Sequence, residues 1–145
     1  MKKFLLTFVA LTFCFVNLTA QVRDINKEEL PKNAQQFINK HYAQEKISIA
    51  TMEKEGISKE YKVILNDGTK VEFDKKGNWK NINSKRDGSV PKAIVPTEIA
   101  KYVESKFPKS KIVNIDKDKK GYEVELDNGV ELEFNSKYKL IKTDR

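Results

Sequence analysis

Four glutamates recur at alternate positions in the C-terminal part of the sequence. They are Glu123, Glu125, Glu131 and Glu133, two on each side of the segment Asp127-Asn128-Gly129. Alternate residues of a strand point to the same face of a sheet, so an antiparallel hairpin here would gather the four carboxylates on one face. Such a cluster could bind a basic protein surface or a cation. The alternative is a solvated strand face, neutralised by Lys137, Lys139 or the lysines of DKDKKG at residues 116–121.

Paired carboxylates can also act as the acid and base of glycoside hydrolysis. That chemistry needs a carboxyl group with a raised pKa in an enclosing cleft, whereas an open antiparallel face leaves carboxylates in water. The single histidine, His41, lies at the end of a predicted helix without a cysteine or serine arrangement to serve, and we expect a partly exposed cation. We therefore predict no catalytic residue and no enzyme activity.

The segment DKDKKG resembles the start of a calcium-binding loop. Its twelfth position, counted from Asp116, holds Asp127 instead of the bidentate glutamate that such loops require. One histidine without a cysteine partner does not make a metal site either. We predict no metal site and no cofactor.

The first twenty residues have the pattern of a secretory signal peptide. Lys2 and Lys3 precede an apolar run over residues 4–16, too short to span a bilayer, and we predict cleavage after Ala20. Cleavage would remove Cys14, the only cysteine, and would lower the formal net charge from +7 by the two lysines. The other lysines are scattered without a cluster, which disfavours nucleic-acid binding. We expect a periplasmic or secreted protein with no membrane insertion after cleavage.

The rest of the chain contains one pattern twice. Residues 30–47 align with 95–112, and residues 61–83 align with 122–144. Apolar residues have helical spacing in 30–42 and 95–107, and the period then changes to that of strands. The predicted strands are 46–52, 61–65, 69–73 and 78–82, then 111–116, 122–126, 130–134 and 139–143. The fold class is therefore α+β, a tandem repeat of an α-β-β-β-β unit at residues 21–84 and 95–145, with a linker at 85–94.

The turns predict how the strands pair. A three-residue turn ending in Gly68 places Val63 opposite Val71, and one ending in Gly129 places Val124 opposite Leu132. A similar turn at residues 75–77 would place Phe73 opposite Trp79 and Glu72 opposite Lys80, whereas Tyr138 replaces the glycine in the second copy, so that turn must differ or be strained. The apolar face would hold Tyr61, Val63, Leu65, Val71, Phe73 and Trp79, then Tyr122, Val124, Leu126, Val130, Leu132, Phe134 and Leu140, and the helices would pack there.

The opposite face is the predicted binding surface. It would hold Lys62, Ile64, Lys70 and Glu72 in the first copy and Glu123, Glu125, Glu131 and Glu133 in the second. Lys62 and Glu72 would face each other as a complementary pair. In the second copy, glutamate would face glutamate, and like charges directly opposed are destabilising.

These patterns resemble the PepSY-like domains of exported bacterial proteins, which share a fold with the β-lactamase-inhibitor proteins. The likeness rests on LPKNAQQFINKHY followed by YKVILNDGTKVEFDKKGNW, and on VPTEIAKYVESKFPKSKI followed by YEVELDNGVELEF. It implies antiparallel sheets joined into one broad curved sheet, with the helices on one side and a protein-binding face on the other. The expected function is a secreted, non-catalytic protein-binding module of the cell envelope. The alternative is an inhibitor or regulator of an exported hydrolase, a peptidase or a β-lactamase.

Overall fold

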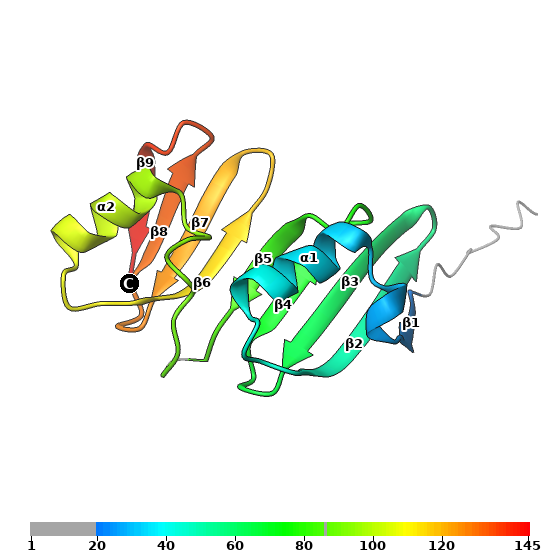
Figure 1. Cartoon of the computed structure of the whole chain (residues 1–145). Helices are drawn as coiled ribbons and strands as arrows, with labels where there is room; N and C mark the ends of the chain where they lie inside the picture. The colour runs from blue at the N-terminus through cyan, green and yellow to red at the C-terminus, as the bar shows by residue number, and fades with distance from the viewer. Residues whose placement is uncertain (1–19, 86) are drawn as a thin grey trace, which may run out of the picture.

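The computed structural model describes residues 20–85 and 87–145, which form one nine-stranded antiparallel sheet with two α-helices (Figure 1). The strands follow one another across the sheet in chain order, from β1 to β9. The elements are β1 (Gln21–Asp24), a 3-10 turn (Lys27–Glu29), α1 (Lys32–His41), β2 (Ile47–Glu55), β3 (Ser58–Leu65), β4 (Lys70–Phe73), β5 (Trp79–Asn83), α2 (Thr97–Lys106), β6 (Ile112–Lys117), β7 (Gly121–Leu126), β8 (Glu131–Asn135) and β9 (Leu140–Asp144). The α+β class and the antiparallel sheet are confirmed.

The predicted signal peptide and Cys14 lie outside the described residues. Within the described ranges, neither helix has the length and apolarity needed to cross a membrane.

Both helices begin directly after a proline, and an aromatic C-cap residue, Tyr42 or Phe107, follows the last helical residue. Pro31 and Pro96 precede the first helical residues, where a missing N–H costs no helical hydrogen bond. Each helix buries its apolar stripe against a strand. The Phe37 ring of α1 meets Phe73 of β4 edge-on at 5.7 Å, and the Tyr102 ring of α2 meets Phe134 of β8 at 5.6 Å.

The two central hairpins have the predicted register. Val63 pairs with Val71, and Val124 pairs with Leu132. The N–H of Leu65 donates to Thr69 and that of Leu126 donates to Val130, which closes two three-residue turns. The glycines that end these turns have φ values of 87° and 82°, the left-handed conformation that their positions require.

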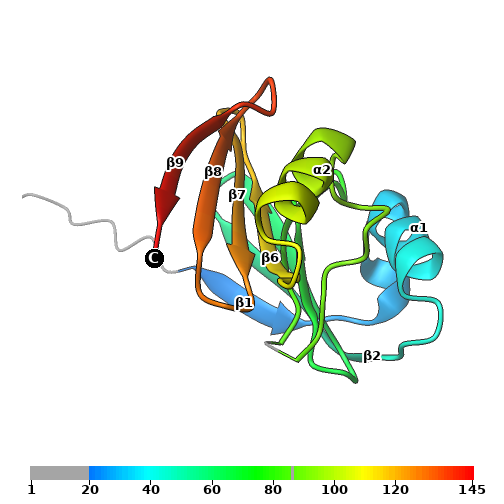
Figure 2. The same cartoon turned by 90° about the vertical axis from the view of Figure 1, so that its left-hand side faces the viewer.

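Two predictions about the sheet are wrong, one in the β4–β5 ladder and one at the edge strand β9. Glu72 lies opposite Asn81, because Lys80 is an extra residue at an irregularity in the β4–β5 ladder, although Phe73 does face Trp79. Leu140 is 38% exposed instead of buried. It pairs with Phe134 as predicted for the core face, but β9 is the last strand and has no neighbour on its outer side, as Figure 2 shows.

The first strand of the sheet, β1, is an element that the sequence pattern did not reveal. It pairs with the far end of β2, from Gln21 opposite Lys54 to Asp24 opposite Thr51. The β6 strand joins the two halves of the sheet by pairing with β5, and the opposed side chains Ile82 and Ile115 are fully buried. The register of the first strand after each helix is interrupted by an irregularity between Ile47 and Ile49, and between Ile112 and Asn114.

Candidate functional site: an acidic sheet face

Six carboxylates lie on one face of the last four strands, and we call this set the acidic face. They are Asp116, Glu123, Glu125, Glu131, Glu133 and Asp144. Their strand neighbours Ile115, Val124 and Leu132 are fully buried on the side that packs against α2. Alternate residues point to opposite faces, so the carboxylates point away from the helix into solvent.

The strand pairing arranges these residues in two rows across the sheet. The first row runs Asn81, Asp116, Glu123, Glu133, Lys142 on successive strands from β5 to β9. The second row runs Asn83, Asn114, Glu125, Glu131, Asp144. Both predicted glutamate pairs, Glu123 with Glu133 and Glu125 with Glu131, are therefore directly opposed.

Partial burial and the neighbouring negative charges both act on the pKa of Glu123, at the centre of the acidic face. The pKa of Glu123 is raised above its ordinary value, first by partial burial and then by the negative charges of Glu131, Asp116 and Glu133. Lys142 opposes this effect. Glu123 therefore holds its proton more tightly than a glutamate in water.

Lys142 is the cation that the sequence analysis missed. It lies opposite Glu133 on β9 and forms an ion pair with Asp144, and this pair, together with Glu133 and Glu131, raises its pKa. The two lysines first considered for this role, Lys137 and Lys139, lie at the β8–β9 turn, where their backbone N–H groups donate to the Asn135 side chain. A carboxylate-rich face with one lysine therefore stays acidic.

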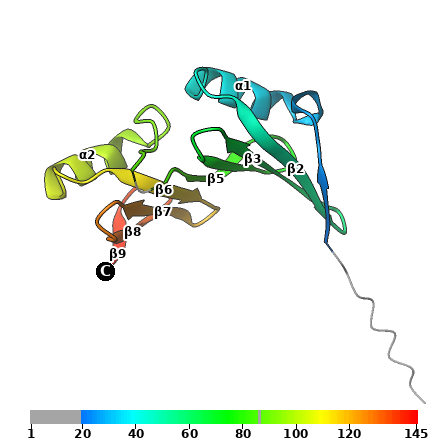
Figure 3. The same cartoon turned by 90° about the horizontal axis from the view of Figure 1, so that it is seen from below.

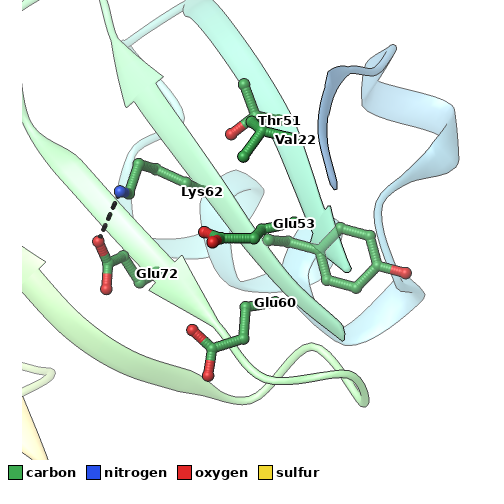
Figure 4. Close-up of a pocket in the computed structure, with 7 residues that line it drawn as sticks. Val22, Thr51, Glu53, Glu60, Lys62 and Glu72 are labelled. Atoms are coloured by element: carbon green, nitrogen blue, oxygen red, sulfur yellow. Dashed lines mark ion pairs between the residues drawn. The ribbon is translucent and has the colours of Figure 1, made fainter. Parts of the chain in front are cut away.

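The predicted residues of the first half of the sheet lie on a mixed surface beside the acidic face. Lys62 and Glu72 form the expected ion pair at 3.1 Å, and Ile64 lies opposite Lys70 in the next row. The pair borders a shallow hollow of about 300 Å³ over β1 to β4 (Figure 4), which is lined by Val22, Thr51, Glu53, Glu60, Tyr61, Lys62 and Glu72. Glu72 reaches the acidic face through Asn81, which is opposite both Glu72 and Asp116.

The amides at the junction between the halves link β5 to β6. The Asn81 side chain donates to Asn114 at 3.1 Å and to Asp116 at 3.3 Å. These bonds fix Asp116 in line with Glu123. The eight predicted surface residues and the three newly found charges thus share one face of the sheet.

A second, smaller hollow of about 190 Å³ lies at the end of the acidic face, and its lining includes Asp116, Asp118, Glu123 and Glu133. Asp118 uses its carboxylate within its own turn, where it accepts the N–H groups of Lys120 and Gly121. In the described part of the chain, no three histidine, cysteine or acidic side chains are grouped so that they could hold a metal ion. The carboxylates of the acidic face lie on an open surface, where they can attract positively charged groups.

His41 lies on α1, away from the acidic face. Its ring is partly exposed, as expected, and packs 4.7 Å from Phe37. Burial, with a smaller effect from the charge of Lys40, lowers its pKa below the ordinary value of 6.5. This lowered pKa acts against the positive charge that we expected at His41.

Comparison with known proteins gives a consistent picture. The family described as beta-lactamase-inhibitor-like, PepSY-like matches residues 59–142. A periplasmic protein of Bacteroides thetaiotaomicron, to which calcium regulation is ascribed, is similar at 44% identity and a TM-score of 0.82, over 86% of this chain and 97% of that one. A periplasmic protein of the DUF2874 family from Bacteroides vulgatus is 40% identical over the same shares, also with a TM-score of 0.82.

A further periplasmic protein of Bacteroides vulgatus is 34% identical, with a TM-score of 0.80, over 88% of this chain and all of that one. No curated protein sequence matches the chain. All three relatives are periplasmic proteins, in agreement with the localisation expected from the sequence.

Proposed function

Because the chain belongs to the PepSY-like family of exported proteins, we propose that it is a non-catalytic protein of the cell envelope that binds a basic partner protein through the acidic face. The face opposite the helices in the first half, with Lys62, Ile64, Lys70 and Glu72, would extend the contact.

The opposed glutamates carry this proposal. Each like-charged pair across a ladder costs a few tenths of a kcal/mol, and Glu123 with Glu133 and Glu125 with Glu131 make two such pairs. Folding does not require them, because the equivalent hairpin of the first half places Lys62 opposite Glu72 at 3.1 Å. A basic partner surface would turn the repulsion into attraction, with a strong dependence on salt.

The arrangement of the helices supports the same conclusion. In Figure 3, α1 and α2 are both drawn on the same side of the strands. We infer from the repeated order, a helix followed by four strands, that the chain is two copies of one unit whose helices cover one face. The uncovered face would then offer an open area for a protein, as the family resemblance implies.

A second candidate function is inhibition or regulation of an exported hydrolase. It is favoured by the description of the matching family as beta-lactamase-inhibitor-like. The two candidates share the acidic face and differ only in the effect on the partner. Turnover by the bound partner, measured with and without this protein, distinguishes an inhibitor from a protein that only binds.

The test compares capture by three immobilised proteins from a periplasmic extract. They are the wild type, a variant with Glu123, Glu125, Glu131 and Glu133 changed to glutamine, and a control with Glu28, Glu45, Glu55 and Glu98 changed to glutamine. Both variants lose four negative charges, but the control residues lie outside the acidic face.

We expect one protein to be captured by the wild type and the control and to be lost with the acidic-face variant. Its dissociation constant, measured after purification, should rise with salt concentration. Equal capture by all three proteins would contradict the proposal. Repeating the capture with calcium and with a chelator shows whether the regulation ascribed to the Bacteroides thetaiotaomicron relative acts on this contact.

A further inference from the structure

Four hairpin turns meet at one end of the sheet, and we call this set the lysine end. They are the turns between β2 and β3, β4 and β5, β6 and β7, and β8 and β9, which we take with the strand residues that flank them as residues 54–59, 74–78, 117–121 and 135–139. In an antiparallel sheet whose strands follow chain order, every second turn lies at the same end of the strands. In Figure 1, these four turns lie at the upper end of the sheet. The four segments contain nine lysines and three carboxylates.

Two of the three carboxylates accept hydrogen bonds from backbone N–H groups of their own turns. Asp74 accepts the backbone N–H groups of Lys76 and Asn78 at 2.8 and 2.9 Å. Asp118 accepts those of Lys120 and Gly121. A neutral side chain, Asn135, does the same in the fourth turn, so the turn geometry does not account for the charge. Of the nine lysines, eight are exposed and Lys117 is partly buried.

The opposite end of the same hairpins is different. The β3–β4 and β7–β8 turns, at residues 66–69 and 127–130, contain Asp67 and Asp127 and no lysine. Lys70 directly follows the first of these turns, and further lysines (Lys40, Lys46, Lys106 and Lys109) lie at this end in the connections that contain the helices. The two ends therefore differ in the charge of their hairpin turns.

An apolar residue projects from the lysine end. Ile57 is completely exposed in the two-residue turn between β2 and β3, after Gly56, whose φ is 57°. The glycine meets the conformational demand of this turn, so a polar side chain would fit the position of Ile57 equally well. The isoleucine is therefore not required by the fold.

Aromatic side chains line a hollow beside these turns. The hollow, about 620 Å³, is bordered by Trp79, Tyr122 and Tyr138 together with several lysines. The Lys117 ammonium lies 4.3 Å from the centre of the Trp79 ring. Tryptophan and tyrosine are the side chains that favour the boundary between lipid and water.

We propose that the lysine end docks on the surface of an anionic lipid bilayer. Lysines near such a surface are attracted by the headgroups, while Ile57 and the aromatic rings enter the boundary region. The attachment is peripheral, and neither helix of residues 20–85 and 87–145 crosses the bilayer. The strands would then be perpendicular to the membrane surface, and neither face of the sheet would contact the lipid. The acidic face would therefore remain accessible to a partner protein.

The experiment measures binding to vesicles of phosphatidylglycerol mixed with phosphatidylcholine and to vesicles of phosphatidylcholine alone. The test variant changes Lys75, Lys76, Lys119 and Lys120 to glutamine. The matched control changes Lys40, Lys46, Lys106 and Lys109, all exposed and at the opposite end, to glutamine. Circular dichroism and urea unfolding establish that each variant is folded.

We expect the wild type to bind only the phosphatidylglycerol vesicles, more weakly as salt is added. Each lysine near the surface contributes about fivefold in affinity, so the test variant, which loses four of them, should bind about six-hundredfold more weakly, while the control stays close to the wild type. Ile57→Ser should weaken binding several-fold.

Two results would overturn the proposal. One is absence of binding to phosphatidylglycerol vesicles, or an equal loss in both lysine variants. The other is binding to a soluble polyanion such as heparin without binding to vesicles, which would assign the lysine end to a different class of ligand.

Discussion

Gly77 and Tyr138 occupy the same position in two three-residue turns, and both have a left-handed backbone, with φ values of 81° and 60°. The turns close with the same hydrogen bond, from Asp74 N–H to Asn78 in one and from Asn135 N–H to Lys139 in the other. A side chain has no room at Gly77, where a Cβ would lie 2.8 Å from the Ala34 nitrogen. Tyr138 instead places its ring 5.5 Å from Tyr122. The same turn is thus made once with a relaxed residue and once with a strained one.

Replacing Tyr138 by glycine and by alanine should separate the backbone strain from the ring contact. Both variants lose the contact with Tyr122, but only the glycine variant relieves the left-handed strain. After allowance for the greater freedom of unfolded glycine, we expect Tyr138→Gly to be more stable than Tyr138→Ala by about 0.5–1 kcal/mol.

Urea unfolding measures this difference. Gly77→Ala provides the comparison, and it should cost about 2 kcal/mol or more, because it adds a close approach to the Ala34 nitrogen to the strain. Equal stability of Tyr138→Ala and Tyr138→Gly would contradict the prediction, because it would show that the left-handed backbone at this position carries no strain.

The central hairpins could be predicted from the sequence because two independent signals coincide there. The alternation of apolar residues defines the buried face, and the turns ending in Gly68 and Gly129 fix which residues are opposed. The errors lie where a second signal is missing. The extra residue Lys80 shifts the β4–β5 ladder without a recognisable sequence mark, and it pairs with Glu60 at 2.5 Å instead of facing Glu72.

The outer parts of the sheet depend on neighbours that local patterns do not specify. Leu140 repeats the position of Trp79, but β5 has β6 beside it whereas β9 ends the sheet. The strand β1 is four exposed residues, QVRD, without an alternating pattern, and it is ordered by pairing with β2. Exposure and strand formation at these positions are tertiary effects.

The core of the acidic face was predictable, and its full extent was not. Opposed glutamates follow from the register of one hairpin. Asp116, Asp144 and Lys142 join them only because β6 and β9 pair with the two sides of that hairpin. The junction between β5 and β6, which connects the face to Glu72 through Asn81, involves strands separated by α2 in the chain.

Glu123→Gln should stabilise the protein at neutral pH by a few tenths to about 1 kcal/mol, because it removes like-charge repulsion from the acidic face. The gain should depend on pH. The pKa of Glu123 is raised in the folded state, so the native protein binds the proton more tightly than the unfolded chain. The wild type therefore recovers stability as the pH falls through this raised pKa, and the recovery is complete below the ordinary value of 4.5.

Urea unfolding of both proteins over the acid range gives the relevant difference. The advantage of Glu123→Gln should be largest near pH 7 and should vanish below about pH 4. The pKa values of Glu29 and Asp74 are lowered, so these two groups make both proteins less stable as the pH falls. They act equally in both proteins, and the readout is therefore the difference in the free energy of unfolding between the variant and the wild type. Glu55→Gln controls for the loss of one exposed carboxylate, and an advantage independent of pH would contradict the explanation.

The junction between the two halves should make them unfold together. Ile82 and Ile115 face each other with no exposed surface, and Ser84 on one side bonds to Val113 on the other through both its N–H and its hydroxyl group.

Leu132→Ala removes a fully buried side chain in β8, which should lower the free energy of unfolding by about 2–5 kcal/mol. If the sheet is one cooperative unit, amide hydrogen exchange should speed up equally at Val124 in the second half and at Val63 in the first. Lys137→Gln, an exposed change in the second half, should leave both rates unaltered. Faster exchange at Val124 with an unchanged rate at Val63 would show that the halves unfold independently.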